Sequence, residues 1–235
     1  PVQKKRTLDP GDSKEMVAAR QRFLNAGFYT QIAEAMSDLA LKALPGDGIG
    51  SVLDAGSGEG YYLRHLSAMA GNIGLALIGV DISKWAVLAA AKQDKQTRWV
   101  VGSNANLPVL PESLDLVLCL FGFPVYSEFA RVLKPGGQVI QVDAGAYHLR
   151  ELREVIYPEV KPPGDSESAA PEGFRQLDST VVRFPLTLPD QASIADLLAM
   201  TPHLYRASAE GLERAAALES LEVTVEATLK RFEKL

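Results

Sequence analysis

The sequence has one cysteine, Cys119, among its 235 residues. A single thiol can form neither a disulfide framework nor a cysteine zinc site within the chain, and its apolar neighbours indicate a buried strand residue. Long hydrophobic runs are also missing, since residues 114–125 (LDLVLCLFGFPV) fall well short of the roughly 20 that a membrane helix requires. No charged-then-apolar signal peptide opens the sequence. We therefore expect a cytoplasmic protein with no metal site in this chain and no membrane partner.

Positive charge is scarce as well, because 24 Lys and Arg residues face 29 Asp and Glu residues, for a formal net charge of −5. Nucleic-acid-binding proteins usually contact phosphates with clusters of Lys and Arg, so the composition does not favour that class. Three basic residues, Lys4, Lys5 and Arg6, do gather at the start. Since residue 1 is Pro and not Met, we expect that a preceding segment was removed, and that segment could have carried a positive surface.

Two helices are expected near the N-terminus. Asp12 follows a turn sequence and can N-cap a helix, while Glu15, three residues later, would complete a capping box. Apolar residues then recur at helical spacing, and a second helix is expected over residues 29–44, before a Pro-Gly pair. We assign residues 1–46 to a basic segment and helical cap, and residues 47–235 to the main domain.

From residue 49 onward, short apolar runs alternate with helical stretches. The runs that predict strands are residues 50–56, 75–83, 97–103, 114–121 and 137–145, and the helical stretches between them are residues 59–70, 84–92 and 126–133. This succession predicts an α/β fold: a Rossmann-like, doubly wound, mostly parallel sheet with helices on both faces. The order of the strands is not predicted.

The last third of the sequence is expected to remain folded after one interruption. Residues 158–173 are rich in Pro, Gly, Ser and acids, which predicts a flexible loop. The pattern then predicts a strand at 179–188, helices at 191–200 and 208–218, and a final strand at 220–232.

The strongest motif is residues 52–62 (VLDAGSGEGYY), where a strand runs into Asp54 and then into alternating glycines. Those glycines are Gly56, Gly58 and Gly60, with Glu59 between the last two. Glycines let the backbone turn tightly and approach a ligand closely. The dinucleotide fingerprint places its last glycine where this sequence has Tyr61, so NAD is disfavoured. The pattern is instead typical of methyltransferases that use S-adenosylmethionine (SAM), in which the carboxylate orients the methionine part.

Later strand ends supply further expected contacts to SAM. Asp81 ends the second strand at the distance from the glycines expected of an acid that binds ribose hydroxyls, and Ile82 would then pack on the adenine. At the end of the third strand, Asn104 and Ala105 are expected to contact the adenine edge. Each signal alone is weak, because a lone acid at a strand end is more often a cap or a surface residue. Their order along the chain favours a methyltransferase.

Five segments are more specific than the motifs that all methyltransferases of this kind share. They are residues 9–29 (DPGDSKEMVAARQRFLNAGFY), 58–62 (GEGYY), 84–92 (KWAVLAAAK), 147–160 (YHLRELREVIYPEV) and 200–207 (MTPHLYRA). These segments resemble the RlmA family of 23S rRNA guanine-N1 methyltransferases, and the resemblance covers essentially the whole chain. It implies methyl transfer to N1 of a guanosine in a hairpin of 23S rRNA by a homodimer.

The resemblance also implies roles for particular residues. The family's two further cofactor contacts fall on Tyr29 and His148, although Tyr29 could be a packing aromatic and His148 a satisfied core or surface residue. Family members begin with a small zinc module of Cys and His ligands. This sequence starts just after the point where that module would end, so zinc is expected only in a module absent from this chain.

The base pocket is expected at residues 121–124, where the family's Tyr-Ala-Pro becomes Phe121, Gly122, Phe123 and Pro124. A displaced base commonly stacks on aromatic groups, and this strand end lies beside the methyl donor in the fold. Core packing is the competing interpretation. Removal of the N1 proton requires a base, for which Asp12 and Asp143 are candidates by location alone, so no catalytic residue is assigned.

Two other functions remain open at this point. The acidic net charge would suit a small-molecule methyltransferase in which the N-terminal helices cover a compact pocket. The chain could also be a fragment that binds SAM or RNA without turnover.

Overall fold

The computed structural model describes residues 10–160 and 169–235, and within these ranges the chain forms one seven-stranded sheet in the order β3-β2-β1-β4-β5-β7-β6. The strands are β1 (Gly50–Ala55), β2 (Leu75–Asp81), β3 (Arg98–Val101), β4 (Leu114–Leu120), β5 (Leu133–Ala144), β6 (Phe174–Leu188) and β7 (Leu221–Lys234). Strands β1 to β5 pair in parallel, and β7 is antiparallel to both of its neighbours. The predicted Rossmann-like α/β class is confirmed.

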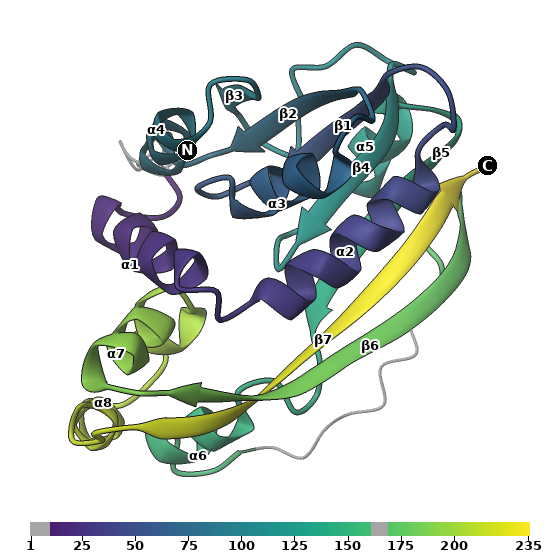
Figure 1. The fold of residues 1–235 in the computed structure, drawn as a ribbon. Helices are drawn as coiled ribbons and strands as arrows, with labels where there is room; N and C mark the ends of the chain where they lie inside the picture. The colour runs from purple at the N-terminus through teal and green to yellow at the C-terminus, as the bar shows by residue number, and fades with distance from the viewer. Residues whose placement is uncertain (1–9, 161–168) are drawn as a thin grey trace, which may run out of the picture.

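Helices cover the sheet on both faces and extend beyond it (Figure 1). They are α1 (Lys14–Asn25), α2 (Thr30–Ala43), α3 (Tyr61–Ala70), α4 (Lys84–Gln93), α5 (Tyr126–Val132), α6 (Arg150–Ile156), α7 (Gln191–Ala199), α8 (Ala209–Ala216) and the short 3₁₀ helix η1 (Pro202–Tyr205). The expected helices and strands are present. Helix α6 and η1 were not predicted, and β5 and β6 begin earlier than expected.

The cap of α1 corrects one prediction. Ser13 is the N-cap, because its side chain accepts a hydrogen bond from the backbone N–H of Met16 at 3.3 Å. The expectation that Asp12 caps this helix, with Glu15 completing a capping box, is therefore wrong by one residue. The Asp12 carboxylate forms an ion pair with Arg20 instead, so it is not available to the end of the helix.

The core lies between the sheet and the helices. Ile32, Met36 and Ala40 of α2 are fully buried, at the spacing expected for one face of a helix. The central strands are apolar on both faces, as parallel strands covered on both sides require. Cys119 on β4 is 1% exposed, which confirms the expected buried strand residue. The burial of apolar side chains in this core is the main favourable contribution to folding.

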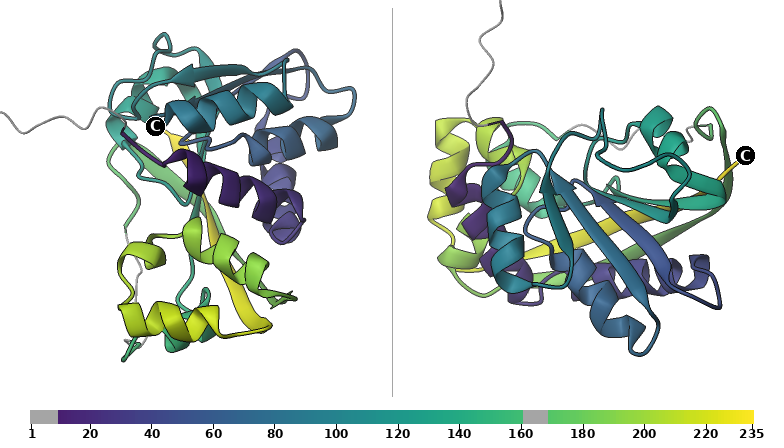
Figure 2. Two further views of the ribbon diagram at one scale, coloured as in Figure 1. Left: turned by 90° about the vertical axis from the view of Figure 1, so that its left-hand side faces the viewer. Right: turned by 90° about the horizontal axis from the view of Figure 1, so that it is seen from above.

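Strands β6 and β7 form a long antiparallel pair that reaches from the rest of the sheet to a smaller lobe, defined here as α6, α7, η1 and α8 (Figure 1). Helix α6 packs on α8 and β7, and α7 packs on α1. Helix α1 also contacts α3 and α4, so it lies between the lobe and the sheet layer (Figure 2). No helix in the described ranges has the length and apolar character to cross a membrane.

Candidate active site

The glycine-rich loop between β1 and α3 is shaped by positive backbone angles. Gly56, Gly58 and Gly60 have φ of +94°, +55° and +84°, a region that side chains disfavour. The backbone N–H of Gly56 donates to the Val80 carbonyl at 2.8 Å, which holds the loop against β2. Around a Cβ added at Gly56, the nearest atom would be Nδ2 of Asn104 at 4.0 Å. The loop therefore leaves an open space at the end of β1, as a ligand cradle requires.

Asp54 lies at the end of β1, directly before this loop, and its carboxyl group is unusual in being buried without a partner in the described ranges. Its side chain is buried, and neither carboxylate oxygen has a hydrogen-bond partner among the described residues. Burial, with a further contribution from Asp81, raises the pKa of Asp54 to about 8. A buried carboxylate without a partner is costly. A cationic group such as the ammonium of methionine would satisfy it, so this position fits SAM.

Asp81, at the end of β2, by contrast accepts hydrogen bonds on both carboxylate oxygens. One oxygen accepts the Gly58 N–H at 2.9 Å and the other accepts the Ser83 N–H at 2.8 Å. Burial raises the pKa of Asp81, and these two hydrogen bonds oppose the rise. Each oxygen keeps a further acceptor position, which fits the ribose hydroxyls. The next residue, Ile82, is 45% exposed and thus open to an adenine ring.

Asn104 connects the third strand end to the rest of the site. Its side-chain amide donates to the carbonyls of Ala55 and Phe123, both at 3.3 Å. It therefore lies between the end of β1 and the expected base pocket. Ala105 follows it and is exposed.

Tyr29, His148 and Phe121 meet beside β4 although they are distant in the sequence. The Tyr29 hydroxyl lies 3.2 Å from Nε2 of His148, and the imidazole is stacked on Phe121 with ring centroids 5.9 Å apart. Nδ1 of His148 accepts the Glu226 N–H at 3.2 Å, so in the neutral ring the proton is on Nε2 and is donated to Tyr29. Burial lowers the pKa of His148 to about 4, which keeps the ring neutral.

The 121–124 loop is strained at its first residue and exposed beyond it. Phe121 has φ of +51°, which is uncommon for a residue with a large side chain and is often found at functional sites. Its N–H donates to the Val142 carbonyl at 2.7 Å, which fixes the turn. Phe121 is 39% exposed and Phe123 is 89% exposed, so neither is a core residue. Gly122 and Pro124 are half-buried between them.

Glu59 is placed differently from the other residues of its motif. Its buried carboxylate accepts hydrogen bonds from Arg64 on α3 and from Gln93 on α4. The side chain therefore joins two helices, and one oxygen, Oε1, remains without a partner among the described residues.

The structure thus brings most of the predicted site residues to the carboxyl ends of β1, β2 and β4. It adds Arg20 of α1, which the sequence analysis did not single out and which lies over Gly58. No local pattern marks this arginine, since α2 and β1 separate it from Gly58 along the chain. In the described part of the chain, no three His, Cys, Asp or Glu side chains gather as a metal site would require.

Known methyltransferases resemble this chain in sequence and in fold. Residues 52–137 match a family model described as a methyltransferase domain. The chain is 33% identical over 221 residues to YxjB of Bacillus subtilis (strain 168), provisionally named as a 23S rRNA (guanine-N(1)-)-methyltransferase, covering 90% of this chain and 77% of that protein. It is 29% identical over 212 residues to the 23S rRNA (guanine(748)-N(1))-methyltransferase of Streptomyces fradiae, covering 88% and 74%. The crystal structure of the Bacillus subtilis YcgJ protein, at 21% identity and a TM-score of 0.51, covers 86% of this chain and 98% of that one, and shares the fold.

Proposed function

Because the chain belongs to the family of 23S rRNA (guanine-N1)-methyltransferases, we propose that it transfers a methyl group from SAM to N1 of a guanosine in a hairpin of 23S rRNA. The observation that carries the proposal is the meeting of Tyr29, His148 and Phe121 beside the end of β4. It joins the expected cofactor contacts to the expected base pocket.

The cofactor would lie along the strand ends. Bound SAM supplies an electrophilic methyl group on a sulfonium. Asp54 would receive the ammonium group, Asp81 the ribose hydroxyls, and Ile82 the adenine face. The open space beside Gly56 supports this approach, and Asn104 and Ala105 would contact the adenine edge. Carboxyl groups suit a cofactor that carries a sulfonium and no pyrophosphate, because their ionised forms attract its positive charge.

The guanine would be displaced from its helix toward the 121–124 loop. Enzymes that modify the Watson–Crick edge must remove the base from pairing, and they commonly stack it on aromatic groups. The exposure of Phe121 and Phe123 supports this role, because a core function would bury both rings. The stacking of Phe121 on the neutral His148 ring supports a fixed orientation for the platform.

No catalytic base is assigned, although the N1 proton must leave during transfer. Asp12 is paired with Arg20, and Asp143 accepts a hydrogen bond from Gln141 at 2.7 Å. Burial raises the pKa of Asp143, but no described contact links it to the 121–124 loop. For both acids, the observed partners explain their positions.

Several finer expectations belong to the same proposal. The substrate would place the protein in the cytoplasm, and the family resemblance favours a homodimer whose subunits together shape an RNA cleft.

The test is to supply tritiated SAM and unmodified large-subunit rRNA, to map the label, and to identify the nucleoside by mass spectrometry. We expect label in a 23S rRNA hairpin and N1-methylguanosine as the product. Methyl groups found only on other atoms or bases would contradict the guanine-N1 assignment. Transfer to small molecules without any transfer to rRNA would favour the small-molecule alternative.

A further inference from the structure

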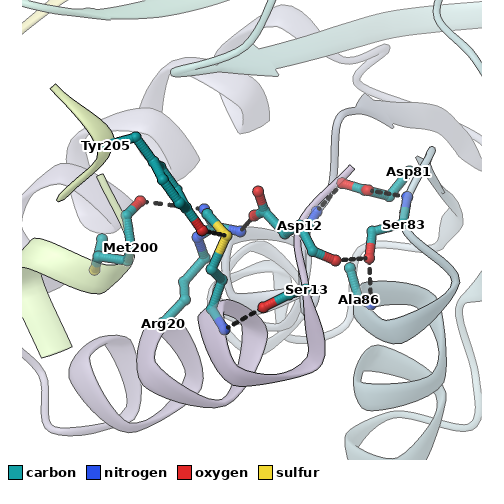
Figure 3. A network of polar contacts seen from close by, with 10 residues as sticks. Asp12, Ser13, Arg20, Asp81, Ser83, Ala86, Met200 and Tyr205 are labelled. Carbon is teal, nitrogen blue, oxygen red and sulfur yellow. Dashed lines mark hydrogen bonds and ion pairs between the residues drawn. The ribbon is translucent and has the colours of Figure 1, made fainter. Parts of the chain in front are cut away.

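Arg20 of α1 lies beside Gly58 of the glycine-rich loop, and Figure 3 shows its contacts with Asp12 and Met200. If Gly58 carried a Cβ, its nearest atoms would be Cδ and Nη1 of Arg20, both at 3.8 Å. Arg20 is half-buried, with 22% of its side chain exposed. This cation therefore lies directly beside the loop along which the cofactor would run.

The guanidinium is held in place by two groups of the chain. Nη1 forms an ion pair with the Asp12 carboxylate, and Nη2 donates to the Met200 carbonyl at 3.2 Å. A guanidinium has five N–H donors in a fixed planar arrangement. These two contacts leave donors that can bind an anion without any change in the backbone.

The position of Arg20 is also tied to the acid that would bind ribose. Ser83 donates from Oγ to the Asp12 carbonyl at 2.7 Å, and the Ser83 N–H donates to Asp81. Figure 3 shows these contacts as one continuous network from Met200 through Arg20 and Asp12 to Asp81. Because these contacts hold Arg20 in place relative to Asp81, they would also hold it in place relative to a cofactor whose ribose binds Asp81.

Arg20 and Asp54 lie within electrostatic reach of one buried hydroxyl. Burial raises the pKa of Tyr62, Asp54 adds to the rise, and Arg20 opposes it. The site thus offers an unpartnered carboxyl group and a guanidinium, both near Tyr62 in the first turn of α3. The methionine part of SAM carries one ammonium and one carboxylate, so its two charges match these two groups.

We propose that Arg20 binds the methionine carboxylate of SAM, while Asp12 and Met200 act as positioning groups that hold its guanidinium. This inference rests on the proposed function, because it assumes SAM as the cofactor. The assignment gives α1 a direct part in cofactor binding.

Calorimetric titration with two ligands tests the assignment. SAM carries the carboxylate, whereas decarboxylated SAM retains the sulfonium, the ribose, the adenine and the amino group. Wild-type protein should bind SAM about tenfold to hundredfold more tightly than decarboxylated SAM, as expected for hydrogen bonds to a charged group. Arg20→Gln should lose most of this preference through weaker binding of SAM, while its affinity for decarboxylated SAM stays near that of wild type.

Arg22→Gln is the matched control, since Arg22 lies on the same helix in an exposed ion pair with Asp196 and should keep the wild-type preference. Thermal unfolding of both variants shows whether each folds. Arg20→Gln losing both ligands equally while remaining folded would overturn the proposal, as would a preference that the substitution leaves unchanged. If wild-type protein binds neither ligand, the proposed function fails, and this inference fails with it.

Discussion

Asp54 has a carboxyl group whose burial should be visible in the pH dependence of stability. Its pKa is raised to about 8 in the folded protein, whereas an unfolded chain gives about 3.9. The folded state therefore keeps a proton that the unfolded chain has lost, and this contribution to stability is full below about pH 4 and is lost as the pH rises toward 8. We predict that the free energy of unfolding without cofactor falls across this range by up to about 1.4 kcal/mol per pH unit.

The measurement is denaturant unfolding of wild type and Asp54→Asn from pH 4 to pH 8. The amide cannot ionise, so the variant should lack this part of the slope and should be the more stable protein at pH 8. Bound SAM should reduce the wild-type slope, because its ammonium group stabilises the ionised carboxylate. Parallel profiles for the two proteins would show that Asp54 is not the buried acid described above.

The His148 ring gives a second prediction at the scale of single residues. Because Nδ1 accepts the Glu226 N–H, we expect a neutral ring protonated on Nε2 throughout the physiological range. The pKa of His148 is lowered to about 4, so the ring should gain a second proton only as the pH falls well below its ordinary value near 6.5. Long-range ¹H–¹⁵N NMR correlations report both the tautomer and the titration.

Tyr29→Phe is the informative variant for this pair. It removes the oxygen that accepts the His148 proton, and loss of such a buried hydrogen bond should cost about 1–3 kcal/mol of stability. The tautomer should persist, since the Glu226 contact that fixes it remains. A ring protonated on Nδ1 in wild-type protein would contradict the hydrogen-bond assignment.

At the scale of elements, most of the sheet could be predicted because parallel strands are continuous apolar runs. Strands β1, β2 and β4 begin at the expected residues. Strand order could not be predicted, since it depends on contacts between distant segments. Helix α6 was missed because it follows Leu149, whose positive φ of +53° cannot be recognised from an ordinary leucine in the sequence.

The candidate site also contains some residues that the sequence predicts and others that it does not. Asp54, the glycines and Asp81 were located by their positions after strands, which a local pattern encodes. Arg20 was not found, because its contacts with Gly58 and Met200 join segments that the sequence separates widely. The α1 cap was misplaced for a different reason. Asp12 and Ser13 are both good N-caps, and the ion pair of Asp12 with Arg20, on the same helix that would be capped, decides between them.

The loop that follows β4 supports a prediction about turnover. Phe123 is 89% exposed, so Phe123→Ala should change stability little, yet it should lower RNA methylation about tenfold or more if a base stacks there. Phe121→Ala should lower turnover similarly, while SAM affinity changes little in both variants. Methylation kinetics on rRNA together with calorimetry separate these effects. Wild-type turnover by both variants would place the base pocket elsewhere, with residues 200–207 the next candidate.

At the scale of the whole molecule, α1 connects the sheet layer to the lobe by contacting both. It contacts α3 and α4 on the sheet side and α7 on the lobe side, and Arg20 carries this connection to Met200. Tyr205 of η1 adds a contact from its hydroxyl to the sulfur of Met16 at 3.2 Å. A ligand that binds Arg20 should therefore order more of the chain than the loop that it touches.

Hydrogen exchange measured with and without SAM tests this connection. A ligand present at 100 times its Kd stabilises the folded state by about 2.7 kcal/mol, and exchange that requires local opening near the site should slow accordingly. We predict added protection in the glycine loop, in α1 and around Met200, because the Arg20 contacts join these segments. The part of the β6–β7 pair that is far from α1 should change less. In Arg20→Gln, the loop should still gain protection at saturating SAM, whereas the segment around Met200 should not. Equal protection of that segment in both proteins would mean that the lobe responds to the cofactor by a route independent of Arg20.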